Sequence, residues 1–149
     1  MRKGGKGMQE GLPPRQMDEA EIQELRSVYV DLVGFVPPRI QARTDLLSRV
    51  DPEGLRLQEA LRRHFMYPKC FDVKTAQLML FGMLLMNLQD AAKLHAIAAR
   101  RAGATWEELA AVVGLAFLFR GLSAANYGSQ ILMEIAQAEA QGAEQAGRR

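Results

Sequence analysis

Apolar residues recur at helical spacing in the first part of the chain. After Asp18 they follow one another at intervals of three and four, which places them on one face of an amphipathic helix. These positions are Ile22, Leu25, Val28, Tyr29 and Leu32. Asp18 and Glu21 form a capping-box pattern that begins the helix, and Gly34 ends it.

Two further helices are predicted before residue 70. Pro37 and Pro38 favour the start of the second, and Asp51 with Pro52 fits the N-cap and first turn of the third. The apolar positions are Ile40, Leu46, Leu47 and Val50 in the second helix and Leu55, Leu57, Leu61 and Phe65 in the third. The third helix is expected to end near Tyr67 and Pro68.

Residues 73–86 form the most apolar stretch of the chain, and Asp72 is a plausible N-cap for it. Nearly every residue after the first turn is apolar, and a helix that is hydrophobic all round is buried on every side. We therefore expect this helix to contact a second subunit as well as its own fold. The apolar run 78–86 is too short to span a bilayer, so we expect no membrane partner.

Helix boundaries are also marked in the second half. Asn87 and Asp90 bracket a short break, and a helix containing His95 follows until Gly103. Thr105 with Glu108 is a second capping box, which opens a helix over residues 106–120. Gly121 stops that helix, and Ser123 is expected to cap a last one that runs to about Gln141.

The pattern predicts an all-α fold. No segment alternates apolar and polar residues with a period of two, so no sheet is expected. We predict an array of six or seven helices in one domain over residues 18–141. Residues 1–17, rich in Gly, Pro and charge, are expected to form a disordered basic arm, and residues 142–149 a frayed tail.

Composition excludes several function classes. The net charge of +2 is small and lies partly in the termini, which argues against a nucleic-acid partner. The single cysteine, Cys70, excludes an internal disulfide and a Cys-only metal site, and suits a reducing cytoplasm. The basic N-terminus is not followed by an apolar segment, so we expect no secretory signal. The two histidines, His64 and His95, lack metal-ligand spacing, and we predict no metal or other cofactor.

His95 is the main candidate for chemistry. Small and apolar residues surround it in sequence, among them Ala91, Ala92, Ala96 and Ala98, which would leave room beside the ring. From spacing alone, a core histidine bonded to a carbonyl is the more common case. His64 follows two arginines on an amphipathic helix and favours a surface or subunit contact.

An ordered set of motifs lies around His95. Upstream stands Asp72-Val-Lys74-Thr75-Ala-Gln77-Leu78. The histidine is followed by an alanine-rich turn, by Gly103-Ala104-Thr105 and by a glutamate-rich helix start. Downstream stands Phe119-Arg120-Gly121-Leu-Ser-Ala-Ala. Over about residues 70–130, this order resembles the carboxymuconolactone decarboxylase family, which includes the alkyl hydroperoxidase D-like proteins.

The resemblance implies an alkyl hydroperoxidase D-like helical fold that assembles as a homo-trimer or hexamer. Two departures from the family pattern matter. Leu88 and Ala91 stand where the peroxidase branch has Cys-x-x-Cys, so disulfide-based peroxide reduction is rejected. Gln77, or Ala76 if the break between helices is one residue shorter, stands where the family has a carboxylate. Asp90 is then the nearest carboxylate in sequence.

The function that the resemblance implies is that of a cofactor-free lyase. It would act on a small anionic substrate, either a carboxylated lactone or an enolisable acid, as in the catabolism of aromatic compounds. His95 would be the general acid/base, Arg120 would neutralise charge, and Gln77 would orient the histidine or donate to the developing oxyanion. Pocket-wall residues would be Tyr67, Cys70, Asp90 and Tyr127.

Alternative interpretations stay open for Arg120, for Cys70 and for the function of the whole chain. Arg120 also fits a basic residue that complements a helix C-terminus, and Cys70 also fits an inert, partly buried thiol. The whole chain also fits a non-catalytic oligomeric scaffold or binding protein of the same family, because both reactive sets of the family are incomplete.

Overall fold

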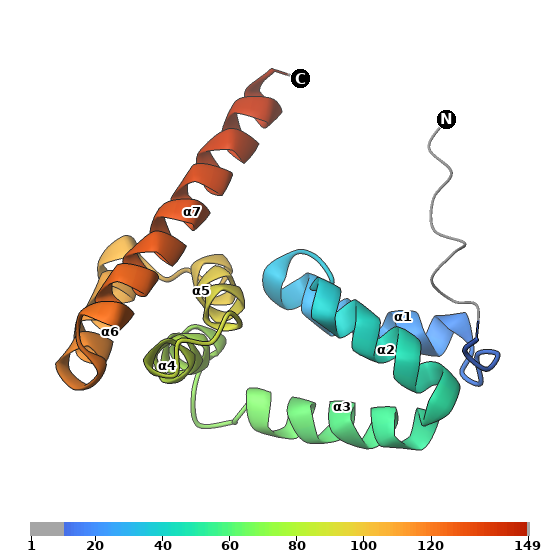
Figure 1. The fold of residues 1–149 in the computed structure, drawn as a ribbon. Helices are drawn as coiled ribbons and strands as arrows, with labels where there is room; N and C mark the ends of the chain where they lie inside the picture. The colour runs from blue at the N-terminus through green and yellow to red at the C-terminus, as the bar shows by residue number, and fades with distance from the viewer. Residues whose placement is uncertain (1–10, 149) are drawn as a thin grey trace. The chain divides into compact units, whose positions relative to one another are not determined.

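The computed structural model describes residues 11–148, so most of the predicted N-terminal arm (residues 1–10) and Arg149 lie outside the described residues. All regular structure in the described part is helical, which confirms the predicted all-α fold (Figure 1). The helices are α1 (Glu19–Val33), α2 (Pro38–Val50), α3 (Pro52–Met66), α4 (Val73–Met86), α5 (Ala92–Arg101), α6 (Trp106–Arg120) and α7 (Leu122–Gly147).

These helices divide into two units, one ending at Phe65 and the other beginning at Met66. The first unit contains α1, α2 and nearly all of α3. The second contains α4 to α7, with α4 packed against α5 and α6, and α6 packed against α7. The candidate chemistry lies in the second unit. The single domain expected over residues 18–141 stays a prediction.

Most helices begin at the predicted residues. Asp72 accepts a hydrogen bond from the backbone N–H of Thr75 at 2.7 Å and caps α4. Thr105 and Glu108 form the complete capping box that begins α6. Asp18 caps α1, accepting from the N–H of Glu21 at 2.7 Å.

The predicted start and end of the last helix are wrong. Helix α7 begins at Leu122, directly after Gly121, and has no side-chain cap, so Ser123 lies inside its first turn. Gly121 adopts a φ of +79°, a conformation that glycine takes without strain, and this turns the chain sharply from α6 into α7. Helix α7 then continues to Gly147 rather than ending near Gln141, because residues 136–146 are mainly Ala, Gln and Glu, which are good helix formers.

The buried faces of α2 and α3 also differ from the prediction. In α2 the fully buried residues are Thr44 and Ser48, whereas the predicted core residues Leu46 and Val50 are exposed. In α3 the residues buried are Leu55 and Glu59. The other predicted core positions of α3 are exposed, with Leu57 61%, Leu61 60% and Phe65 70% accessible. Polar residues are buried here because each finds a partner inside the unit.

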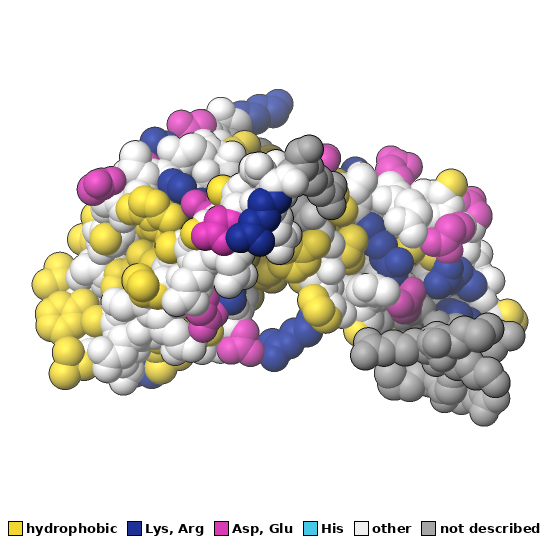
Figure 2. Space-filling view, turned by 90° about the horizontal axis from the view of Figure 1, so that it is seen from above, with side chains coloured by type: hydrophobic (Ala, Val, Ile, Leu, Met, Phe, Trp, Pro, Cys, Tyr) yellow, Lys and Arg dark blue, Asp and Glu magenta, His cyan; other side chains and the backbone are white. Residues whose placement is uncertain are grey.

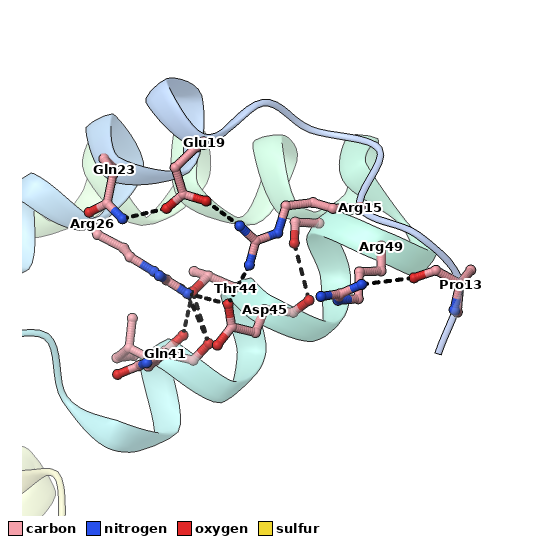
Figure 3. Close-up of polar contacts among 11 residues, drawn as sticks. Pro13, Arg15, Glu19, Gln23, Arg26, Gln41, Thr44, Asp45 and Arg49 are labelled. Atoms are coloured by element: carbon pink, nitrogen blue, oxygen red, sulfur yellow. Dashed lines mark hydrogen bonds and ion pairs between the residues drawn. The ribbon is translucent and has the colours of Figure 1, made fainter. Parts of the chain in front are cut away.

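The interior of the first unit is held by arginine contacts (Figure 3). Arg26 donates to the hydroxyl of Thr44 at 2.7 and 2.9 Å and to the carboxylate of Asp45 at 2.8 Å. Arg15 reaches the same Asp45 oxygen at 3.2 Å and also pairs with Glu19. Buried polar groups are tolerated when hydrogen bonds satisfy them, and these contacts join α1 to α2.

Among residues 11–65, Glu59 is the most buried charged residue, at 1% exposed. Its carboxylate accepts from the hydroxyl of Tyr29 at 2.8 Å and from Arg62 at 3.0 Å, and it pairs with Arg43. Burial by itself would raise the pKa of Glu59, but the hydrogen bonds from Arg43, Tyr29 and Arg62 outweigh it and lower the pKa. Burial and the contact with Glu59 raise the pKa of Tyr29 to about 12.

The second unit has an apolar core between its four helices. Phe81 and Leu85 of α4 pack there with Leu109 of α6 and Ile131 of α7, all nearly inaccessible. The other helices of the second unit do not cover α4 on every side, as Met79 and Met83 are 43% and 55% exposed. The other side of the helix carries Gln77 into the interior.

Candidate functional site

The structure brings His95 and Gln77 together. The ring Nδ1 of His95 lies 2.7 Å from the side-chain Oε1 of Gln77. Gln77 is fully buried, whereas His95 is half-buried. Gln77, rather than the neighbouring Ala76, is therefore the α4 residue that contacts the imidazole. Sequence alone left this choice open because the phase across the α4–α5 break was not fixed.

The turn between α4 and α5 sets this geometry. Asn87 ends α4, and the N–H groups of Leu88 and Gln89 bond to the last carbonyls of that helix, at Leu85 and Leu84. Leu88 adopts a φ of +52°, the left-handed region that reverses a chain in few residues. The chain thus returns along α4, so that one turn into α5 the ring of His95 meets Gln77.

A third residue, Met66, completes the contact. The side-chain amide nitrogen of Gln77 donates to the thioether sulfur of Met66, with the two atoms 3.5 Å apart. Both ends of the buried amide therefore have a protein partner. Sequence reasoning missed Met66 because a methionine at the end of an amphipathic helix carries no motif, and its contact depends on the turn over residues 67–72.

Asp90 and Tyr127 form a second pair. The hydroxyl of Tyr127, in α7, donates to Asp90 Oδ1 at 3.4 Å across the α4–α5 turn. Burial, followed by the nearby Asp90 carboxylate, raises the pKa of Tyr127. Both residues were predicted to line a substrate pocket, and the structure places them together although they are far apart in sequence.

The structure exposes the other three predicted site residues. Arg120 is exposed as the last residue of α6, and Tyr67 and Cys70 are exposed near the segment that leads into α4. Their functional roles stay predictions.

An ion pair links two of the motifs around His95. Lys74 Nζ lies 2.8 Å from Glu108 Oε1 and joins the first turns of α4 and α6. The hydrogen bond from Lys74 lowers the pKa of Glu108, and the same contact raises the pKa of Lys74. Lys74 therefore has a structural contact that joins α4 to α6. Sequence reasoning treated the two motifs separately and did not predict the contact.

A groove of about 570 Å³ lies between α4 and α6, beyond this ion pair. It is mostly apolar and is lined by Asp72, Lys74, Thr75, Leu78, Met79, Gly82, Met83, Met86, Glu108, Val112, Leu115, Ala116 and Phe119. Hydrophobic side chains also gather at the left of Figure 2, where α6 and the start of α7 lie. Neither His95 nor Gln77 lines the groove, so it is separate from the histidine pair.

The described residues form no candidate metal site and no candidate membrane span. Over residues 11–148, no three His, Cys, Asp or Glu side chains group as ligands for a metal ion. None of the helices in that range is long and apolar enough to cross a bilayer.

Comparison with known proteins places the chain in a family. The sequence model of the carboxymuconolactone decarboxylase family matches residues 52–134, more than half of the chain. This chain belongs to the carboxymuconolactone decarboxylase family. The matched residues include the Met66–Gln77–His95 contact and the Lys74–Glu108 ion pair, so the resemblance inferred from the motifs is confirmed.

A solved structure shares the carboxymuconolactone decarboxylase fold. It is the crystal structure of a protein from Burkholderia xenovorans LB400 that is provisionally named a carboxymuconolactone decarboxylase. The two proteins are 19% identical with a TM-score of 0.67, and the match covers 89% of this chain and 99% of the other. At this identity the likeness shows the fold alone. No curated protein matches the chain.

Proposed function

We propose that this chain is a cofactor-free lyase that acts on a small carboxylated lactone or enolisable acid, with His95 as general acid and base. The contact between His95 and Gln77 is the observation that carries the proposal. The buried amide of Gln77 fixes the orientation of the His95 ring. The imidazole is only half-buried, so a substrate can still reach it. Such positioning is what a general acid/base requires.

The proposed reaction has two parts. The substrate carboxylate leaves as carbon dioxide, and the electron pair of the broken carbon–carbon bond moves into the conjugated carbonyl to give an enolate. The imidazolium of His95 then delivers its proton to carbon and recovers one from water. The same imidazole, when neutral, can remove an acidic proton from an enolisable acid, so both substrate classes use one group.

Two roles were expected for Gln77, and its position favours one of them. Its carbonyl faces His95 and its amide nitrogen faces Met66, so both ends are already engaged inside the protein. Gln77 therefore orients the histidine in this proposal and does not donate to a substrate oxyanion. The anion would be met by Arg120, which is exposed and always charged. Tyr67, Cys70, Asp90 and Tyr127 remain the proposed pocket walls.

The test is a turnover assay on a panel of small lactone acids and enolisable acids. Turnover is measured as the release of carbon dioxide and as the change in ultraviolet absorbance. His95→Gln is expected to lower the rate by about 10²- to 10⁴-fold. His64→Gln is the matched control, since His64 is exposed on α3, and it should keep full activity. If the chain turns over no acid, or if both variants match the wild type, the lyase proposal fails and the non-catalytic scaffold replaces it.

We also propose that the chain is a cytoplasmic homo-oligomer, a trimer or hexamer. Large apolar side chains exposed on α4 and α6 support this, with Met83 55%, Leu115 63% and Phe119 82% accessible. Exposed apolar surface on this scale is typical of an interface. Light scattering on the purified chain is expected to give a trimer or hexamer, and Phe119→Ser to shift the mass towards the monomer. A monomeric wild type would contradict the proposal.

A further inference from the structure

We propose that Met66 is a positioning residue that fixes the tautomer of His95 through Gln77. In this arrangement Nδ1 of His95 carries the proton, and Nε2 is the basic nitrogen of the neutral ring. The consequence for catalysis rests on the proposed function, but the tautomer itself follows from the contacts among these three side chains.

The first step concerns the two ends of the Gln77 amide. Its Oε1 can only accept a hydrogen bond and its Nε2 can only donate. Gln77 has an exposed fraction of 0%, so both ends must use protein partners. One end lies 2.7 Å from His95 Nδ1, and the other lies 3.5 Å from the sulfur of Met66.

The second step is the choice between the two amide orientations. A thioether sulfur accepts a weak hydrogen bond but has no proton to donate. If the amide of Gln77 were reversed, its carbonyl would face Met66 without a donor, and a buried carbonyl without a hydrogen bond is costly. Met66 therefore selects the orientation in which the amide N–H points to sulfur and the carbonyl points to His95.

The third step follows for the imidazole. Because the carbonyl of Gln77 can only accept, Nδ1 of His95 must donate and so must carry a proton. In a neutral imidazole the other nitrogen, Nε2, then holds the lone pair. A carboxylate at position 77 would impose the same tautomer from either oxygen. The two ends of an amide differ, so Gln77 needs the sulfur of Met66 to choose between them.

The test is nitrogen NMR of histidine-labelled protein at a pH where His95 is neutral. Both ring nitrogens are observed in a His64→Gln background, which leaves His95 as the single histidine. We expect the Nδ1–H tautomer to dominate. Met66→Leu conserves volume but removes the acceptor, and it should lower the tautomer ratio by about two- to tenfold. Met79→Leu, on the exposed side of α4, is the matched control and should leave the ratio unchanged.

A second variant keeps the test decisive. In a Gln77→Glu background either oxygen of the carboxylate can accept, so Met66→Leu should no longer change the tautomer ratio. The inference is overturned if wild-type His95 carries its proton on Nε2, or if Met66→Leu leaves the ratio unchanged in the Gln77 protein. If the expected ratios are found but no acid is turned over, the proposed function fails while the positioning role of Met66 stands.

Discussion

The imidazole Nδ1 of His95 lies 2.7 Å from the carbonyl oxygen of the fully buried Gln77. An amide carbonyl accepts a hydrogen bond from the ring but brings no negative charge to it. A carboxylate in its place would stabilise the imidazolium by charge as well as by hydrogen bonding. A carboxylate at position 77 would therefore favour the imidazolium form of His95 more than the amide of Gln77 does.

Gln77→Glu is accordingly predicted to raise the pKa of His95 by about one unit or more relative to the wild type, because an opposite charge at this distance favours the cation. Proton NMR titration of the His95 ring measures the change directly. In the turnover assay, the limb of the pH profile that requires neutral His95 should move to higher pH by the same amount. Gln77→Leu, which brings no charge, serves as the control and should not raise the pKa of His95. An unchanged titration in Gln77→Glu would show that the carboxylate takes up the proton or turns away.

Local signals in the sequence predicted much of the fold. Asp72 and Thr105 begin helices, and Gly121 ends one, because each acts on backbone groups within three or four residues of itself. The same short range of action explains why the predicted cap at Ser123 was wrong. Ser123 is a good capping residue, but the positive-φ turn at Gly121 had already begun the helix at Leu122.

The candidate site was predicted in part. Sequence order identified His95 and placed Gln77, or alternatively Ala76, at the position of the missing carboxylate, but which of them meets the histidine depends on the turn at Leu88. Met66 could not be predicted, since its sulfur acts through a long-range contact and has no spacing rule. Leu57 and Leu61 show a second limit of sequence analysis. Helical periodicity identified them as an apolar face, but it could not tell that the other helices of their unit leave this face exposed.

The buried Glu59 should make the first unit sensitive to acid. Hydrogen bonds lower its pKa below the usual 4.5 despite burial, so its stabilising contribution is present above about pH 4.5 and is lost as pH falls through the lowered pKa. Glu59→Gln should lower the free energy of unfolding at pH 7 by about 2–3 kcal/mol, because Arg43 and Arg62 lose their counter-charge. Urea unfolding from pH 7 to pH 3 measures both effects.

Wild-type stability should fall more steeply than that of Glu59→Gln below pH 4.5. Glu53→Gln is the matched control on the same helix, since the Glu53 side chain is 72% exposed. It should follow the wild-type curve. If the Glu59 and Glu53 variants have the same acid dependence, the carboxylate of Glu59 does not hold this unit together.

Tyr29 should make the stability of the first unit fall as pH rises in the alkaline range. Burial and Glu59 raise its pKa from 10 to about 12, so its contribution is complete below about pH 10 and is lost as pH rises through 12. Tyr29→Phe removes the hydrogen bond to Glu59 and should cost about 1 kcal/mol at pH 8. Between pH 10 and pH 12, urea unfolding should show the wild type approaching the stability of the variant.

Tyr67→Phe, at an exposed position, should leave the alkaline curve unchanged. A gap between the wild type and Tyr29→Phe that stays constant over this range would contradict the raised pKa.

Two glycines of α7 provide a test of the packing in the second unit. A Cβ atom at Gly128 would lie 2.7 Å from Val113 of α6 and 2.9 Å from Leu85 of α4, closer than side chains pack, whereas a Cβ at Gly142 would meet open space. Gly128→Ala should therefore lower the free energy of unfolding by about 1–3 kcal/mol through overpacking. Gly142→Ala should raise it by up to about 1 kcal/mol, since alanine favours a helix.

Chemical denaturation measures the free energy of unfolding of both variants. Because both carry the same Gly→Ala change in the same helix, the comparison separates the effect of packing from that of helix propensity. Position 142 lies beyond the predicted helix end, so its response also tests whether α7 continues there. A loss of stability at Gly142→Ala would contradict the continuous helix. A gain at Gly128→Ala would instead mean that α7 lies further from Val113 and Leu85 than the structure places it, and the core around Phe81 would then be less tightly packed.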